Sequence, residues 1–166
     1  MFRIAKLTDY GIVLLTHFAS HPEREALNAR ELSQETHLPF PTVGKLLKTL
    51  VHGELLVSHR GTNGGYRLAR RPTEINVAQI ISILEGPIEI TECNTPGTCG
   101  QEPSCPVQSN WRLINGAIRE ALEKVSLAEI AIPQHTHRWP LVSASATATL
   151  PSLGGGSHEL TRSLEP

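Results

Sequence analysis

The stretch PFPTVGKLLKTLVHGELLVSHRGTNGGYRL, residues 39–68, decides the fold expected for this chain. Pro41 is suited to the first position of a helix, and the residues after it are apolar at helical spacing. Residues 55–59 predict a strand, 61–65 a turn and 66–68 a returning strand, because Asn-Gly-Gly between extended segments favours a hairpin. The apolar stripe of the helix consists of Val43, Leu46, Leu47 and Leu50.

The residues before this stretch predict two further helices. Asn28 followed by Glu31 is a capping pattern that marks a helix running to about Thr36, and the prolines after it break that helix. An earlier helix is expected over about 9–20, capped by Thr8. Two short helices joined by a tight turn and followed by a hairpin form a winged helix-turn-helix, so the predicted fold class is mainly α with a small β-hairpin.

Positive charge is concentrated on this predicted unit. Residues 42–71 carry six Lys or Arg against one acid, a net charge of +5, although the whole chain has a formal charge of −1. Basic side chains bind a phosphate backbone by releasing its condensed counterions, so double-stranded DNA is the expected partner. The alternatives are a solvated charged face, or helices packed on a hairpin with no role in DNA binding. The expected DNA-contacting residues are Thr42, Lys45, Lys48, Arg60 and Arg67, with Gly64 and Gly65 shaping the wing.

Three cysteines, Cys93, Cys99 and Cys105, are separated by two gaps of five mostly small residues. An odd number of thiols does not form a closed set of intramolecular disulfides. Thiolates at such intervals suit either zinc or an iron–sulfur cluster, or remain reduced without metal. Zinc is the less supported metal, since the chain has no fourth cysteine and no histidine between His59 and His135.

Composition sets wider bounds on the function. A chain of 166 residues with 39% hydrophobic content predicts one or two small domains. No run of 18 apolar residues and no signal-peptide pattern occur, so a cytoplasmic protein without membrane contact is expected. The sequence contains no phosphate-binding loop or HExxH pattern, and an enzyme is not expected.

Three segments resemble one bacterial family. VSHRGTNGGYRLAR (57–70) is similar to the wing of the IscR and NsrR family of winged-helix transcription regulators, while AKLTDYGIVLL (5–15) and INVAQIISILEGP (75–87) are similar to its first helix and its post-wing helix. The resemblance spans residues 1 to about 131 and is closest to the regulators of SUF iron–sulfur assembly operons. It implies a repressor of such genes that senses cluster status or redox stress through a labile cluster, of the 2Fe–2S type, on the three cysteines.

The resemblance leaves the fourth cluster ligand open. IscR-type members have a histidine where this chain has Gln108, and a neutral amide is a poor iron ligand. NsrR-type members use an aspartate from the first helix of the partner subunit, and the matching residue is Asp9. A role for Asp9 in stabilising the N-terminus of its own helix is the alternative.

The expected organisation is a winged helix-turn-helix domain over 1–90, a cysteine loop over 91–107 and a helix over 108–131. The family implies that this last helix forms a homodimer, and its apolar stripe suits that role. Residues 132–166 are rich in Ser, Thr, Gly and Pro, which predicts a disordered tail. Two other functions stay open, a zinc-stabilised winged-helix regulator and a redox or cluster-carrier protein without DNA binding.

Overall fold

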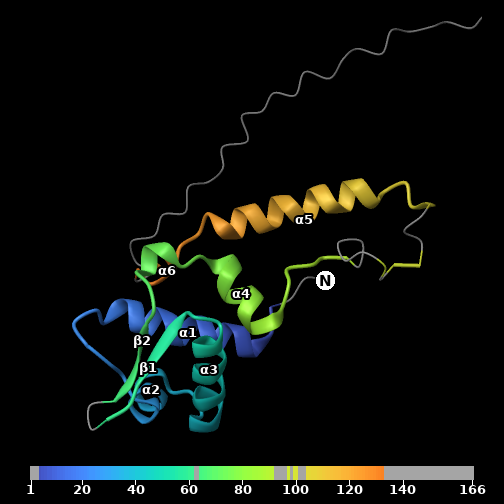
Figure 1. Ribbon diagram of the computed structural model, residues 1–166. Helices are drawn as coiled ribbons and strands as arrows, with labels where there is room; N and C mark the ends of the chain where they lie inside the picture. Colours follow the sequence, from blue (N-terminus) through green and yellow to red (C-terminus); the bar gives the residue numbers. More distant parts are fainter. Residues whose placement is uncertain (1–3, 62–63, 92–96, 98, 101–103, 133–166) are drawn as a thin grey trace, which may run out of the picture.

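The structure is a computed structural model that describes residues 4–61, 64–91, 97, 99–100 and 104–132. Six α-helices, a short 3-10 helix and a two-stranded antiparallel hairpin occur in the described residues (Figure 1). None of the described helices is long and apolar enough to span a bilayer. The elements are α1 (Lys6–Ser20), α2 (Ala29–Thr36), α3 (Phe40–His52), β1 (Leu56–His59), β2 (Gly65–Leu68), η1 (Pro72–Glu74), α4 (Val77–Glu85), α5 (Gln108–Glu123) and α6 (Leu127–Ile130).

A single main core joins α1, α2, α3, the hairpin and α6. Leu127 of α6 is fully buried in this core, which it shares with residues of α1 that are more than a hundred positions away in the chain. The predicted apolar stripe of α3 is confirmed, because all four of its residues are buried. The largest fully buried side chains are Leu14, Leu15, Leu27, Leu32, Leu46, Leu47, Leu50, Leu55, Leu56, Ile75, Ile80 and Leu127.

The helix-turn-helix and the wing follow the sequence prediction closely. The side chain of Asn28 accepts hydrogen bonds from the amides of Arg30 and Glu31, and the backbone amide of Asn28 donates to the Glu31 carboxylate. This is the predicted capping box. Helix α3 begins at Phe40, one residue earlier than expected, and Pro41 lies within its first turn. The hairpin pairs Leu56 with Leu68 and continues in register to the turn.

The predicted start of the first helix is wrong. Helix α1 begins at Lys6 with Ala5 as its cap residue, so Thr8 lies inside the helix, where its side chain is fully buried. Its hydroxyl has no hydrogen-bond partner among the described residues. The amide of Ala5 instead donates to the carboxylate of Glu85 at the end of α4, over 2.6 Å. This tertiary contact satisfies one of the free amides that a capping side chain would otherwise bind.

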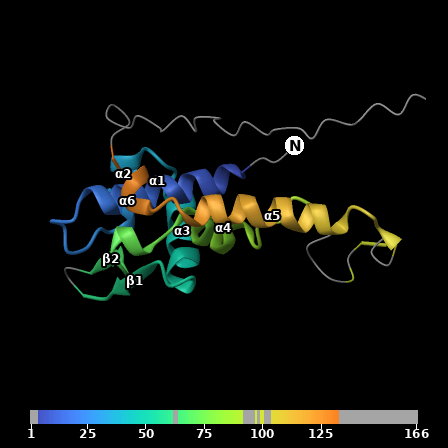
Figure 2. The same cartoon turned by 90° about the horizontal axis from the view of Figure 1, so that it is seen from above.

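The segment 108–131, predicted as one helix, contains two. Helix α5 ends at Glu123, and Ser126 then starts α6 with a capping box that includes Glu129. The break lets α6 turn back to the main core, whereas α5 lies over α4 and extends beyond the winged domain (Figure 2). Residues 133–166 of the predicted tail lie outside the described residues.

Candidate nucleic-acid interface and metal centre

Helix α3 turns a polar, basic face to solvent. Lys45 and Lys48 are exposed opposite the buried leucines, and Thr42 is half-buried at one side of this face. The separation arises because residues three and four apart share a side of a helix, so the apolar stripe and the lysines cannot lie on the same side. The geometry fits a helix that packs on its own domain and presents cations to a partner.

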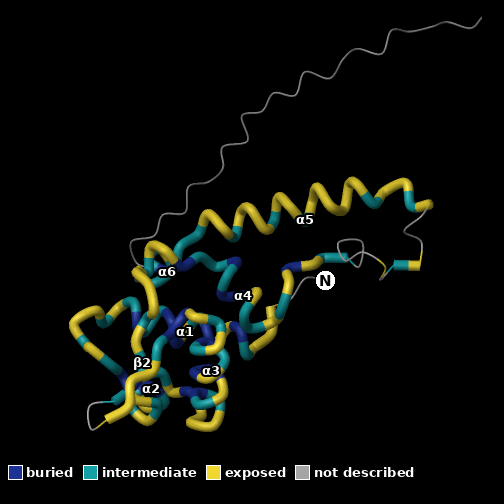
Figure 3. The backbone as a smooth tube through the Cα atoms, in the orientation of Figure 1, coloured by how far each residue is buried: buried dark blue, intermediate teal, exposed yellow. Residues whose placement is uncertain are grey.

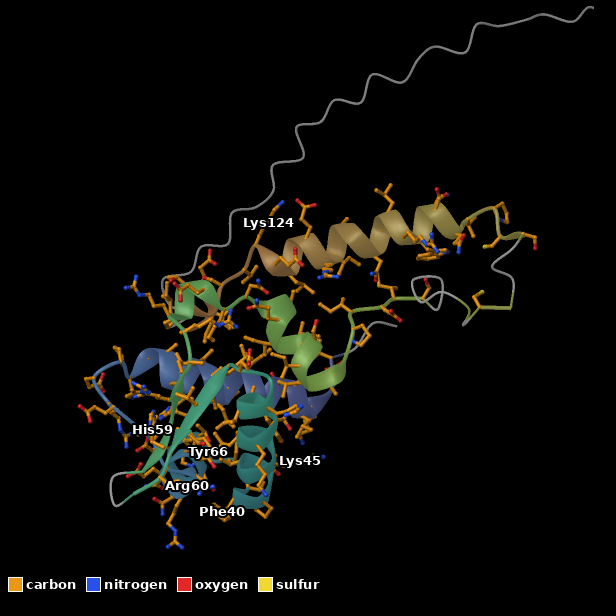
Figure 4. All side chains as sticks on the ribbon, viewed as in Figure 1. Phe40, Lys45, His59, Arg60, Tyr66 and Lys124 are labelled. Carbon is orange, nitrogen blue, oxygen red and sulfur yellow. The ribbon has the colours of Figure 1, made fainter. Side chains whose placement is uncertain are left out.

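The hairpin places two further predicted residues at the surface. Arg60, just after β1, and Arg67, on β2, are both exposed. Arg67 also lines a hollow of about 340 Å³ with Glu25 and His59, so an acid lies near it, whereas Arg60 lies at the tip end of the hairpin (Figure 4). Of the two arginines, Arg60 is the less constrained by its own chain.

The two wing glycines are required by close backbone contacts. A Cβ on Gly64 would lie 2.6 Å from the carbonyl oxygen of His59, and one on Gly65 would lie 2.8 Å from that of Leu27. Backbone atoms cannot move aside cheaply, so both positions exclude larger residues. In the described part of the turn, the positive φ belongs to Gly61, at 130°.

Cations on the winged face differ from those elsewhere in the molecule. In the described part of the chain, Lys45, Lys48, Arg60 and Arg67 form no ion pair. Three cations outside this face are instead paired with nearby carboxylates. Arg24 donates to both oxygens of Glu35 at 2.9 and 2.8 Å, Arg119 pairs with Glu123, and Lys124 pairs with Glu120.

The cysteine loop is described only in part. Cys99 and Cys105 are half-buried free thiols, and Cys93 lies outside the described residues. No group of three potential metal ligands occurs among the residues that are described. Two free thiols on a loop that also carries Cys93 are soft donors of the kind that iron–sulfur clusters and zinc use. The donor set therefore fits either group.

Asn115 fixes the entry to this loop, and sequence reasoning missed it. Its Nδ2 donates to the carbonyl of Ile88 at 3.0 Å, and its Oδ1 accepts from the amide of Ile90 at 3.1 Å. Both bonds tie the start of the cysteine segment to the middle of α5. A polar residue inside an otherwise apolar helical pattern was the available signal.

Asp9 is exposed in the first turn of α1. This position is compatible both with stabilising the positive end of the helix and with reaching a second subunit.

Helix α5 has no buried residue, and Figure 3 shows most of it as exposed. Its apolar stripe is covered only toward the C-terminal end, where Leu122 packs on Ala78, Ile81 and Ile88. The other end of the stripe is open, with Trp111 at 37% and Ile114 at 43% exposed.

A second residue that sequence reasoning missed is Phe40. It is the first residue of α3 and is 54% exposed, while Phe18 is buried in the core. The prolines on either side of Phe40 predict a helix break and a helix start, and the aromatic ring between them was not considered as a functional residue.

The helix-turn-helix and the hairpin beside its second helix define a winged-helix protein of the DNA-binding class. The family is settled by sequence. The Rrf2 family, described as an iron-dependent transcriptional regulator, matches residues 4–132, and this chain belongs to it.

Related proteins agree with this assignment at modest identity. The transcriptional regulator NsrR of Oceanobacillus iheyensis is 29% identical over 129 residues, which cover 76% of this chain and 88% of NsrR. The structure of T. potens IscR matches with a TM-score of 0.60 and 26% identity, covering 78% of this chain and 85% of that one. CymR, titled the global cysteine regulator of B. subtilis, gives a TM-score of 0.63 and 26% identity, covering 79% of this chain and 97% of that one.

Proposed function

We propose that this chain is a homodimeric regulator that binds double-stranded operator DNA through α3 and the wing. The observation that carries the proposal is a contrast in ion pairing. The four cations of this face form no ion pair within the described part of the chain, whereas Arg24, Arg119 and Lys124 are each paired with a carboxylate. Free Lys and Arg side chains release DNA counterions on binding, whereas paired ones would first have to break an ion pair. Lys45, Lys48, Arg60 and Arg67 are assigned to phosphates and groove edges, with Thr42 near the bases.

The DNA-binding proposal is tested with the full chain and a random-sequence duplex library. Repeated selection should enrich a two-part site with half-sites about one helical turn, or about 34 Å, apart. Binding should weaken steeply as salt rises. Recovery of no preferred sequence, together with salt-insensitive binding, would count against a DNA-binding regulator.

The open end of the α5 stripe is assigned to a second copy of the chain. Aromatic and branched apolar side chains such as Trp111 and Ile114 gain free energy when a partner removes them from water. A twofold partner would also bring two α3 helices into successive major grooves. Sedimentation at micromolar concentration should give the mass of a dimer.

Cys93, Cys99 and Cys105 are assigned as ligands of an iron–sulfur cluster, of the 2Fe–2S type, with Asp9 of a second subunit as the fourth ligand. When bound, such a cluster would supply an oxidation-sensitive, soft metal centre. Asn115 would keep the start of the thiol-bearing segment on α5 and so link the state of the thiols to the proposed dimer helix. A difference of about 1–3 kcal/mol in DNA affinity between two states would be enough for regulation.

The metal proposal is tested by the visible spectrum of protein purified without oxygen, with iron, sulfide and zinc measured on the same sample. Sulfide-to-iron charge-transfer bands with matching iron and sulfide are expected, and Cys99→Ser and Cys105→Ser should each remove them. A colourless protein with stoichiometric zinc would favour the second candidate, a zinc-stabilised regulator. Repression of SUF genes is the proposed target and rests on the family resemblance, so operator mapping decides it.

A further inference from the structure

Phe40 has the most exposed large apolar side chain in the described part of the winged domain. It projects from the first residue of α3 at 54% exposure and takes no part in either apolar core. A phenyl ring left in water gives up the stabilisation that burial provides, and Phe18 of the same domain is buried. Figure 4 shows Phe40 at the same end of the domain as Arg60 and away from Lys124 on α5.

Gly44 adds an independent observation beside Phe40. Residues four apart lie on the same side of a helix, so Gly44 follows Phe40 one turn further along α3. A Cβ at Gly44 would meet no atom within 4 Å, and glycine lowers helix stability. The packing of this chain therefore does not require glycine there, unlike at Gly65. The ring of Phe40 is therefore followed, one turn along α3, by a position that has no side chain and faces open space.

The charge around this feature limits what can occupy it. Lys45 and Lys48 lie on the solvent face of the same helix, and neither has an ion-pair partner among the described residues. An apolar ring on the same helix as these cations is complementary to the major groove of DNA. Phosphates flank this groove, and the base edges inside it present one kind of apolar group. That group is the C5-methyl of thymine.

We propose that Phe40 is a specificity-determining residue that contacts a pyrimidine C5-methyl group in the major groove, while Gly44 allows the helix backbone to approach closely. The inference rests on the proposed DNA-binding function. The same methyl group occurs on thymine and on 5-methylcytosine, and either base would satisfy the contact.

The test uses the full chain and the duplex that it selects from a random library. Each thymine of one half-site is replaced in turn by uracil, which removes only the methyl group. Wild-type protein should lose about three- to five-fold in affinity at one or two positions, the equivalent of exposing a methyl group. Placing 5-methylcytosine there should restore more affinity than cytosine does.

Variants separate the contact from general weakening. Phe40→Ala should bind the thymine and uracil duplexes equally, and Phe40→Leu should keep part of the difference. Lys45→Gln is the matched control, since loss of a phosphate contact should weaken binding to both duplexes by the same factor. Thermal melting should show Phe40→Ala to be as stable as wild type, because the ring is exposed.

Two results would overturn the proposal, and they are distinguishable. If wild-type protein binds a selected site but no uracil substitution gives a loss that Phe40→Ala abolishes, the methyl contact is wrong and DNA binding stands. If the full chain, with and without its metal, binds no duplex at any salt concentration, both proposals are wrong.

Discussion

Two surfaces of this chain remain uncovered, and they expose opposite kinds of chemistry. The face formed by α3 and the wing exposes cations that have no ion pair among the described residues. Helix α5 instead exposes apolar side chains, and Arg119 and Lys124 pair with carboxylates four residues away. A surface that leaves charge unpaired suits a highly charged partner. A surface that pairs its charges and leaves Trp111 and Ile114 open suits a partner that is itself apolar. The contrast therefore supports the two proposals, that DNA binds one surface and a second copy of the chain binds the other.

The largest expected effect comes from placing a charge in the apolar stripe of α5. Ile114→Asp should give a monomer at micromolar concentration, because a carboxylate would have to lose its hydration in the interface. Operator affinity should then fall by about 100-fold or more, since two linked half-site contacts become separate ones. Sedimentation and binding to the selected duplex measure the two effects.

Leu113→Asp is the matched control for this experiment. Leu113 is 75% exposed and lies about 100° around α5 from Ile114, outside the stripe that continues through Trp111 and Ile118. This variant should remain a dimer. If Ile114→Asp remained a dimer and Leu113→Asp became a monomer, the second copy would pack on the Leu113 side of α5, and the proposed interface would be wrong.

The next effect concerns the free energy of unfolding of the domain that carries the charged surface. Gly65→Ala should destabilise the fold by about 1–3 kcal/mol, because the new Cβ would clash with the backbone of Leu27. Gly44→Ala should stabilise it by about 0.5–1 kcal/mol, since nothing surrounds that position. Urea unfolding of both variants measures the difference. Equal stability of the two variants would show that the wing does not depend on this close contact.

A smaller effect separates the unpaired cations from the paired ones. Lys45→Gln should weaken binding to the selected duplex by about three- to ten-fold and lower the salt-dependence slope by about one. Lys124→Gln changes an exposed lysine on another helix, but its Nζ lies 2.8 Å from Glu120, and it should have no effect on DNA binding. Equal losses in both variants would show that only the overall charge of the protein matters.

Much of the fold could be predicted because its signals are local. The capping box at Asn28 and the apolar stripe of α3 each lie within a few residues, and both are confirmed. Thr8 misled the prediction because the helix start depends on Glu85, eighty residues away, which binds the amide of Ala5. A capping pattern at Ser126 was present in the sequence, but apolar residues at helical spacing continue up to it and hid the break.

The candidate site could be predicted less completely. Its ionic residues were visible because charge is concentrated in one segment of the sequence, and the structure shows four of them exposed. Whether a cation is paired depends on residues brought near it by folding, as Glu35 is to Arg24. Asn115 binds backbone groups 25 and 27 residues away. Its place in an apolar stripe marks it as unusual, but the local sequence does not indicate which groups it binds.

The smallest expected effect is a pH-dependent loss of stability when the paired cation Arg24 is replaced. The pKa of Glu35 lies below its ordinary value, chiefly because Arg24 donates hydrogen bonds to its carboxylate and also because His17 does. A lowered carboxyl pKa stabilises the fold above its ordinary pKa, and this contribution is lost as the pH falls through the lowered value. Arg24→Gln should therefore move the pKa of Glu35 upward in an NMR titration of its carboxyl carbon. The difference in stability from wild type should be present at neutral pH and vanish in acid.

DNA affinity should not change in the Arg24→Gln variant, because Arg24 is already bound to carboxylates of α2. If Arg24→Gln weakened operator binding as much as Lys45→Gln, pairing would not distinguish the two classes of cation, and the assignment of DNA to the α3 face would lose its main support.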